Sequence, residues 1–235
     1  MTGVGGWHSY YRTMPRKPAA AVSAESKSER TRSRILDAAA HVLSIKGFAG
    51  TRLTDVAEYA ELQAPAIYYY FASREDLIEE VMFRGISDLR GYLQEAMDAL
   101  PPGTAPIDRI MTAVETHLRH ELELSDYARA SIRNSGQIPD RLRTREKKER
   151  SAYNRIWHGL MANAVADGEI RDDLDARLAQ ALVLGALNWA AEWWDPRRSS
   201  VEAMIFNAQV FVRHGLSPTA KPRKRAVKPK ARTRR

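Results

Sequence analysis

Cysteine is absent from the 235 residues of the chain. Disulfide bonds, thiolate zinc sites and thiol catalysis are therefore excluded, and the absence fits a reducing cytoplasm. No run of about 18 apolar residues occurs, so no membrane-spanning helix and no membrane partner are predicted. Sustained alternation of apolar and polar residues is also missing, which argues against strands. The expected fold class is all-α.

Both ends of the chain lack the apolar pattern of a folded segment. Residues 1–24 contain no apolar run, so they are predicted to be a disordered arm and not a secretory signal. Met14, which precedes Pro15-Arg16-Lys17, could equally be the true translation start in place of Met1.

Net positive charge is confined to the end of the chain. The net charge is +8, yet residues 221–235 contain nine Lys and Arg and no acid, leaving 28 basic against 29 acidic residues elsewhere. A tail of this composition over 218–235 is predicted to be disordered. Two interpretations stay open, since it could add sequence-independent affinity for phosphates or only improve solubility.

Helical periodicity is what the sequence does contain. Gly47 is expected to end the first helix, and Ser73, three residues before Asp76, gives a capping pattern for a long one. The boundary between two parts, residues 25–80 and 81–217, falls inside that long helix, so both parts are expected to form one rigid body. Nine helices are predicted, at about 26–46, 52–60, 64–70, 74–99, 106–124, 126–134, 139–167, 174–194 and 200–214.

Two short helices joined by the turn Glu61-Leu62-Gln63 must pack at a steep angle. The exposed start of the second helix can then enter a DNA major groove while the first spans the backbone. Three consecutive tyrosines cannot all face one core, because neighbours on a helix diverge by about 100°. Tyr68 is nevertheless assigned to the core with Phe71. The apolar residues that hold the pair together are predicted to be Leu53, Val56, Ala57, Ala60, Leu62, Ile67 and Phe71.

Side-chain chemistry suggests a role for each candidate DNA contact. Gln63 can both donate to and accept from a base edge, and the Ala64 and Ala66 methyl groups can meet thymine methyls. Hydroxyl groups and cations suit phosphate oxygens. The remaining candidates, which belong to that second group, are Thr51, Arg52, Thr54, Tyr69, Tyr70 and Arg74.

The stretch from Thr31 to about Met82 resembles the DNA-binding domain of the tetracycline-repressor (TetR) family. This resemblance implies a transcriptional repressor with three N-terminal helices and six more, a homodimer that grips a near-palindromic operator in double-stranded DNA, and no enzymatic activity. The motifs that carry it are Arg34-Ile35-Leu36-Asp37-Ala38-Ala39, Gly47-Phe48, Thr51, Asp55-Val56-Ala57, Ile67-Tyr68-Tyr69-Tyr70-Phe71 and Ser73-Arg74-Glu75-Asp76-Leu77.

Two departures from the family pattern affect the turn and the readout. The family usually has glycine where Glu61 stands, and a non-glycine residue with positive φ costs roughly 1 kcal/mol. Ala64 and Pro65 replace small polar residues, so polar readout of bases is thin.

The last two predicted helices are the expected dimerisation region. The segment from Ala181 to Ala191 is apolar on nearly every face, so it should be buried all round, partly by a second subunit. The final helix adds an apolar stripe that includes Met204, Ile205 and Phe211. In the family these two helices form a four-helix, two-fold interface.

Large apolar side chains of the longer helices could line a ligand cavity, although such stripes are ordinarily core. Polar groups interrupt them at His117, Asn188 and Arg133, which suits a ligand with an acyl part and a charged head. The apolar residues concerned are Met82, Phe83, Ile86, Leu89, Met111, Val114, Leu118, Trp157 and Met161.

A second resemblance concerns the effector. Segments 126–134, 138–139 and 185–194 are similar to a TetR branch that regulates lipid or steroid breakdown and releases DNA on binding acyl-CoA thioesters. This implies an acyl-CoA or another apolar effector, with candidate contacts His117, Arg133, Trp157, Asn188 and Trp189. Arg133, Arg141 and Arg145 could meet CoA phosphates, unless the run 141–150 is simply a solvated face.

Other chemistry has little support in the sequence. His117 and His120, followed by Glu121, have a spacing that can bind metal, but no other clear ligand set accompanies them, so neither a metal nor a cofactor is predicted. A Gly-x-Ser-x-Gly motif is absent. The alternatives to a regulator are a helical binding module without a gene target and an enzyme acting on CoA esters.

Overall fold

The computed structural model describes residues 26–124, 126–134 and 136–218, and these form nine α-helices without a strand. The all-α prediction is confirmed. The predicted arm over 1–24 and all but the first residue of the predicted tail over 218–235 lie outside the described residues. The helices are α2 (Lys27–Gly50), α3 (Leu53–Tyr59), α4 (Ala64–Tyr70), α5 (Arg74–Asp98), α6 (Pro106–Arg119), α7 (Asp126–Asn134), α8 (Thr144–Ala166), α9 (Ala176–Trp193) and α10 (Val201–Leu216).

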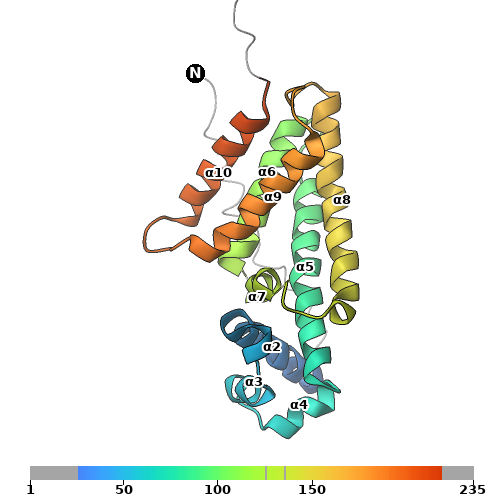
Figure 1. Ribbon diagram of the computed structural model, residues 1–235, viewed down its shortest axis with the longest axis vertical. Helices are drawn as coiled ribbons and strands as arrows, with labels where there is room; N and C mark the ends of the chain where they lie inside the picture. Colours follow the sequence, from blue (N-terminus) through green and yellow to red (C-terminus); the bar gives the residue numbers. More distant parts are fainter. Residues whose placement is uncertain (1–25, 125, 135, 219–235) are drawn as a thin grey trace, which may run out of the picture.

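The helices are arranged as a head and a body with one helix between them (Figure 1). We call α2, α3 and α4 the head, which occupies the lower end of the view. The body consists of α6, α8, α9, α10 and the upper part of α5, the long helix that rises out of the head alongside α8. The short helix α7 lies at the junction, where it packs against both α2 and α5.

Local sequence signals set the helix ends. Ser26 and Glu29 form a capping box at the start of α2. The Ser73 hydroxyl accepts a hydrogen bond from the Asp76 amide, 3.0 Å away, so the predicted cap of α5 is confirmed. Gly47 has φ +70°, which interrupts α2 as predicted, although a short helical turn resumes as far as Gly50.

Two short segments depart from regular α-helix. Residues His120–Leu124 continue α6 as a π-helix, where the sequence predicted an unbroken helix to residue 124. Residues Asp140–Arg143 form a 3-10 turn before α8. Turns of the π type occur frequently at functional sites.

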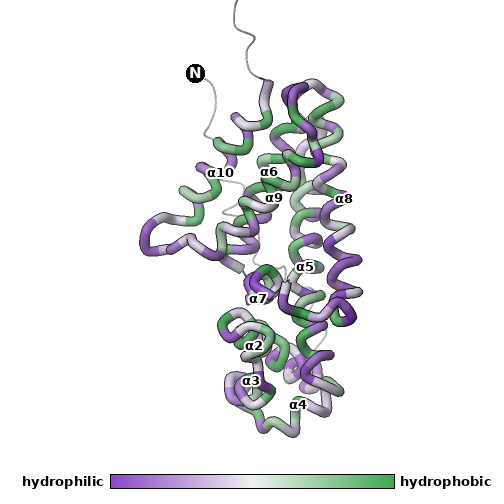
Figure 2. The backbone as a smooth tube through the Cα atoms, in the orientation of Figure 1, coloured by the Kyte–Doolittle hydropathy of each residue, from purple (hydrophilic) through white to green (hydrophobic). Residues whose placement is uncertain are grey.

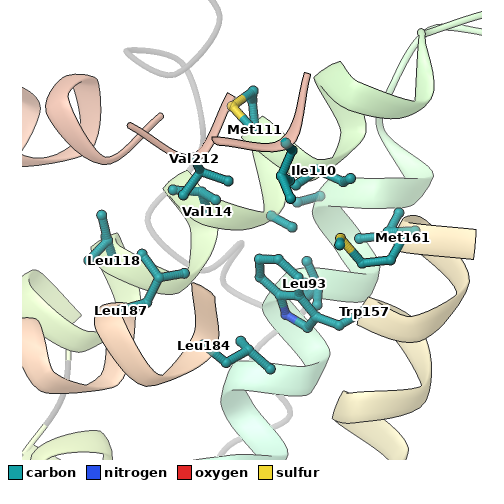
Figure 3. Packing of buried hydrophobic residues seen from close by; sticks show 14 of the residues in the cluster. Leu93, Ile110, Met111, Val114, Leu118, Trp157, Met161, Leu184, Leu187 and Val212 are labelled. Carbon is teal, nitrogen blue, oxygen red and sulfur yellow. The ribbon is translucent and has the colours of Figure 1, made fainter. Parts of the chain in front are cut away.

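The body has its own hydrophobic core, in which Trp157 is fully buried (Figure 3). Side chains from α5, α6, α8, α9 and α10 interdigitate there, including Leu93, Val114, Leu187 and Val212. Of the residues expected to line a ligand cavity, Ile86 and Leu89 border a space of only about 10 Å³. The apolar stripes fill the space between the helices, as they do in most cores.

The core of the head extends into the rest of the molecule. Ile35, Val56 and Ile67 are buried in it together with Ala130 of α7 and Leu142 beyond α7. The head is therefore packed onto α7 without a solvent layer between them.

Two residues expected to line a cavity in the body lie elsewhere. Met82 is buried in the core of the head. Phe83 is only partly buried and lies beneath the Arg145 guanidinium, 4.0 Å from the ring centroid. Both residues precede Ile86, the first residue of α5 that belongs to the body core.

Helices α9 and α10 present an uncovered apolar face. The prediction that α9 is buried all round is met on one side only, because this single chain leaves large side chains of both helices exposed. Patches of hydrophobic character along α10 lie at the edge of the molecule in Figure 2. The exposed members are Leu178, Leu182, Trp189, Trp193, Phe206, Val210 and Phe211. Across the described residues, no helix combines the length and apolar character that a membrane span requires.

Candidate DNA-binding surface and buried polar site

The turn between α3 and α4 fixes the angle of the helix pair. Glu61 adopts φ +55°, so the predicted left-handed turn position is confirmed. The Leu62 amide donates to the Ala57 carbonyl at 2.9 Å, which closes the end of α3. Val56 and Ile67 are fully buried where the two helices cross.

The first turn of α4 and its flank are open to solvent. Gln63 caps the helix and is exposed, Ala64 and Ala66 are half-buried, and Tyr69 is 82% exposed. Tyr70 is half-buried and packs edge-on against Tyr69, with ring centroids 5.0 Å apart.

On the preceding helix, Arg52 and Thr54 are exposed beside the start of α3. The structure therefore brings these two residues, Gln63, the two alanines and the two tyrosines onto the helix pair that the sequence analysis proposed for DNA contact.

Three assignments near this surface need correction. Thr51 is only 3% exposed and its hydroxyl donates to the Gly47 carbonyl at 2.7 Å, so it ends α2 and cannot reach a phosphate. Arg74 turns inward and donates to the carbonyl oxygens of Thr51 and Phe48, so it supports the head. Tyr68 is 59% exposed and not core, because Ile67 and Phe71 already define the buried side of α4.

Helix α7 is tied to α2 by hydrogen bonds at both of its ends. At its start, Asp126 contacts the His41 ring at 2.9 Å, and the Tyr127 hydroxyl donates to Asp37 at 2.8 Å. At its end, the Arg133 guanidinium donates to the Ser44 carbonyl at 2.8 Å. The opposite side of Arg133 reaches Glu192 of α9 at 3.0 Å, so this residue links head and body.

Asn134 is the fully buried member of this contact. Its side-chain oxygen accepts from the Phe48 amide at 2.7 Å, directly after the break at Gly47. Its side-chain nitrogen donates to the carbonyls of Ala130, at 2.8 Å, and Leu43, at 3.2 Å. The amide thus fixes the distorted end of α2 to α7.

A second set of buried polar side chains lies inside the body. His117, His120 and Glu121 are only 1–2% exposed. The His117 Nδ1 is 2.7 Å from the Tyr153 hydroxyl. Burial lowers the pKa of His117 to about 4 against the opposing effect of Glu121, and burial raises the pKa of Tyr153 well above its usual range.

Several atoms of this set have no hydrogen-bond partner: His117 Nε2, both ring nitrogens of His120 and Glu121 Oε2. The Asn188 side chain opposes the effect of burial on the pKa of His117, although His117 Nε2 has no hydrogen-bond partner. Beside Glu121 lies a cavity of about 10 Å³, which Ser131, Arg150 and Asn188 also line. It is as small as a single water.

The five predicted ligand contacts fall into two places. His117 and Asn188 lie at the buried polar set, and Trp157 is packed in the adjoining core. Arg133 and Trp189 instead line an open cleft of about 450 Å³ at the junction, between α2, α7 and α9.

Tyr153 was not predicted to belong to the polar set, and Glu121 was noted only beside the histidine pair with metal-binding spacing. Spacing held the signal for Glu121, because it follows His117 by four residues on the same helical face. In the described ranges, no three metal-ligating side chains form a group that could hold a metal ion.

Comparisons with known proteins bear on both parts of the chain. Residues 35–81 match the family described as "Bacterial regulatory proteins, tetR family", and residues 103–206 match "Tetracyclin repressor-like, C-terminal domain". The chain belongs to the TetR family. It is therefore a DNA-binding transcriptional regulator that acts as a dimer, with a regulatory and not a catalytic role.

Relatives of this TetR-family chain include two regulators of known designation. The HTH-type transcriptional repressor KstR2 of Mycolicibacterium smegmatis is 26% identical over 177 residues, which covers 73% of this chain and 82% of the relative. The fatty acid metabolism regulator protein of Bacillus subtilis is 24% identical over 162 residues, covering 68% and 81%.

Solved structures share the fold of this TetR-family chain. AibR in complex with isovaleryl coenzyme A and operator DNA superposes with a TM-score of 0.70 at 16% identity, covering 80% of this chain and all of AibR. The ketosteroid regulator KstR2 of Mycobacterium tuberculosis gives 0.68 at 19% identity, covering 83% and 99%.

Proposed function

We propose that this regulator represses transcription as a homodimer and leaves its operator when an acyl-CoA thioester, or a similar apolar effector, binds the body. The observation that carries the proposal is the exposed start of α4 on a head whose core continues into α7. One rigid contact thereby joins a DNA-reading element to an interior with unmet polar groups.

The proposed operator contacts follow from exposure. Gln63, Ala64 and Ala66 face base edges, whereas Arg52 and Thr54 contact phosphates. Tyr69 and Tyr70 complete the proposed backbone contacts, and the exposed Tyr68 joins them. A near-palindromic operator presents two such sites about 34 Å apart, one for each head.

The proposed dimer interface is the uncovered apolar face of α9 and α10. Leu178, Leu182, Trp189 and Trp193 share one side of α9 because they recur at spacings of four, seven and four residues. Exposed apolar surface of this extent marks an interaction site. Paired with α10, this face completes the four-helix interface expected of the family.

The proposed division of labour places DNA reading in residues 25–80 and effector binding and dimerisation in residues 81–217. The regulator would work in the cytoplasm, associated with the nucleoid while bound to DNA. The designations of the KstR2 and fatty acid metabolism regulators, and the isovaleryl coenzyme A bound to AibR, support an acyl-thioester effector.

The proposed switch runs through α7. An effector that separates α5 from α7 would pull on Asn134 and Arg133, which hold α2. Both heads would then tilt and lose their match to successive grooves. Release requires that the effector bind this conformation more tightly than the DNA-bound one.

An electrophoretic mobility shift assay with the DNA upstream of the gene that encodes this chain tests the proposal. The full chain should retard this DNA, and a series of acyl-CoAs should release it. Arg52→Ala should weaken binding several-fold, whereas Lys148→Ala, which removes an exposed cation from α8, should not. Release by no thioester would overturn the effector assignment, and release by another apolar compound would replace it.

A further inference from the structure

We propose that Glu121, His117 and His120 form a polar subsite that binds a hydroxyl group within an otherwise apolar acyl effector. The inference rests on the proposed function and specifies which acyl thioesters the body selects: those that carry a hydroxyl on the chain. A saturated, unsubstituted chain would offer no hydrogen bond to the polar atoms of these side chains that lack one.

The first observation is the combination of deep burial and missing partners. The three side chains are at most 2% exposed, yet four of their polar atoms make no hydrogen bond. Native proteins pair nearly all buried polar groups, so each exception calls for an explanation. Glu146, another buried acid of the body, shows the ordinary outcome because it is paired with Arg143 and Arg150.

The second observation is the local backbone. Helix α6 changes into a π-helix at His120, and this turn includes Glu121. π turns are rare in proteins, and those that occur are often found at functional sites. Here α6 and the π turn approach α9, and Asn188 of α9 lines the same small cavity as Glu121.

The third observation is an adjoining space that could open. Glu121 lines the cavity of about 10 Å³ together with Gly85 of α5 and Ser131 of α7. A Cβ added at Gly85 would lie 2.6 Å from the Tyr127 carbonyl oxygen, so α5 and α7 touch here through their backbones. A ligand that enlarged this cavity would separate α5 from α7, which also holds the head.

The chemistry of the unmet atoms selects the ligand group. A carbonyl oxygen only accepts, so a thioester carbonyl could accept from a ring N–H but could not donate to a carboxylate oxygen. A hydroxyl both donates and accepts, so one group could donate to the Glu121 oxygen and accept from a histidine N–H. The N–H of His120 is available in either tautomer of that ring, whereas His117 Nε2 can donate only in the tautomer that carries its proton there.

The decisive experiment compares matched ligands on the full-length dimer by titration calorimetry. The probes are hexadecanoyl-CoA and its 3-hydroxy and 12-hydroxy derivatives, which share the same thioester and CoA. At least one hydroxylated ligand should bind about tenfold more tightly than hexadecanoyl-CoA. Glu121→Met should abolish this preference while binding hexadecanoyl-CoA no more weakly than the wild type.

A matched control separates the subsite from general effects on the helix. Glu123→Met places the same substitution two residues away at an exposed position, and it should keep the preference. If hexadecanoyl-CoA binds and neither hydroxyl changes the affinity, the subsite is refuted while the proposed function stands. If none of the thioesters binds, the proposed function fails and the subsite with it.

Discussion

The junction and the body both bury polar side chains, but they treat them differently. At the junction, the Asn134 amide is completely buried and uses its oxygen and its nitrogen in three hydrogen bonds. In the body, Glu121 and the two histidines are as deeply buried, and much of their hydrogen-bonding capacity is unused. The contrast teaches that the first group fixes the contact between α2 and α7, whereas the second leaves polar atoms that the proposed effector could bind.

Replacing Asn134 tests the satisfied side of this contrast and has the largest expected effect. Asn134→Leu keeps the approximate side-chain volume but leaves the buried Phe48 amide without a partner. The free energy of unfolding should fall by about 3 kcal/mol, measured by urea denaturation. Asn163→Leu, at an exposed position of α8, should change it by under about 0.5 kcal/mol. Equal losses for both variants would contradict the role of Asn134.

Acidification should lower the free energy of unfolding through the protonation of His117. Burial lowers the folded-state pKa of His117 to about 4, below the unfolded value of 6.5, so the unfolded chain binds the proton first as the pH falls. The stability that neutral, buried His117 contributes is complete above pH 6.5 and is lost as the pH falls towards 4. The free energy of unfolding should therefore fall by roughly 2 kcal/mol between pH 7.5 and 5.

His117→Asn removes the titrating ring but can still bond to Tyr153, so its stability should vary less with pH by that amount. His158→Asn, at an exposed site on α8, should keep the wild-type slope in chemical denaturation series. A parallel profile for wild type and His117→Asn would show that His117 does not titrate in the way its burial requires.

The break in α2 provides a third test, through the backbone. Gly47 has φ +70°, and Gly47→Ala should cost about 1.5 kcal/mol because a side chain disfavours this conformation. Gly91→Ala, inside α5 with no atom within 4 Å of the added Cβ, should instead stabilise by roughly 0.7 kcal/mol. Opposite signs in thermal unfolding are the expected result, and a Gly47→Ala variant as stable as the wild type would refute the assigned strain.

The smallest effect is expected at the buried polar set of the body, where some polar atoms lack hydrogen-bond partners. Glu121→Met should raise the free energy of unfolding by about 1 kcal/mol, because an apolar side chain removes an unpaired polar group from the core. Glu123→Met, which is exposed, should have little effect. A loss of stability in Glu121→Met would mean that Glu121 is already satisfied in solution, and the contrast with Asn134 would disappear.

Helical periodicity and capping signals in the sequence were sufficient to predict the helices. The motifs between Thr31 and Met82 were sufficient to indicate the family. Gly47 and the Ser73 cap act within a few residues, so they are readable without the fold. The positive φ at Glu61 followed from comparing one turn position with the family pattern. Such signals survive because backbone sterics and capping hydrogen bonds are local.

Side-chain direction and pairing were decided only by the tertiary structure. Thr51 and Arg74 have groups suited to phosphate, yet carbonyl oxygens from neighbouring turns take their donors. Glu121 and Asn134 each have charged or polar neighbours in the sequence, and only packing buries both and leaves one carboxylate oxygen without a partner while the amide is fully bonded. The reason is physical: hydrogen bonds between distant segments depend on where helices meet, and no single segment contains that information.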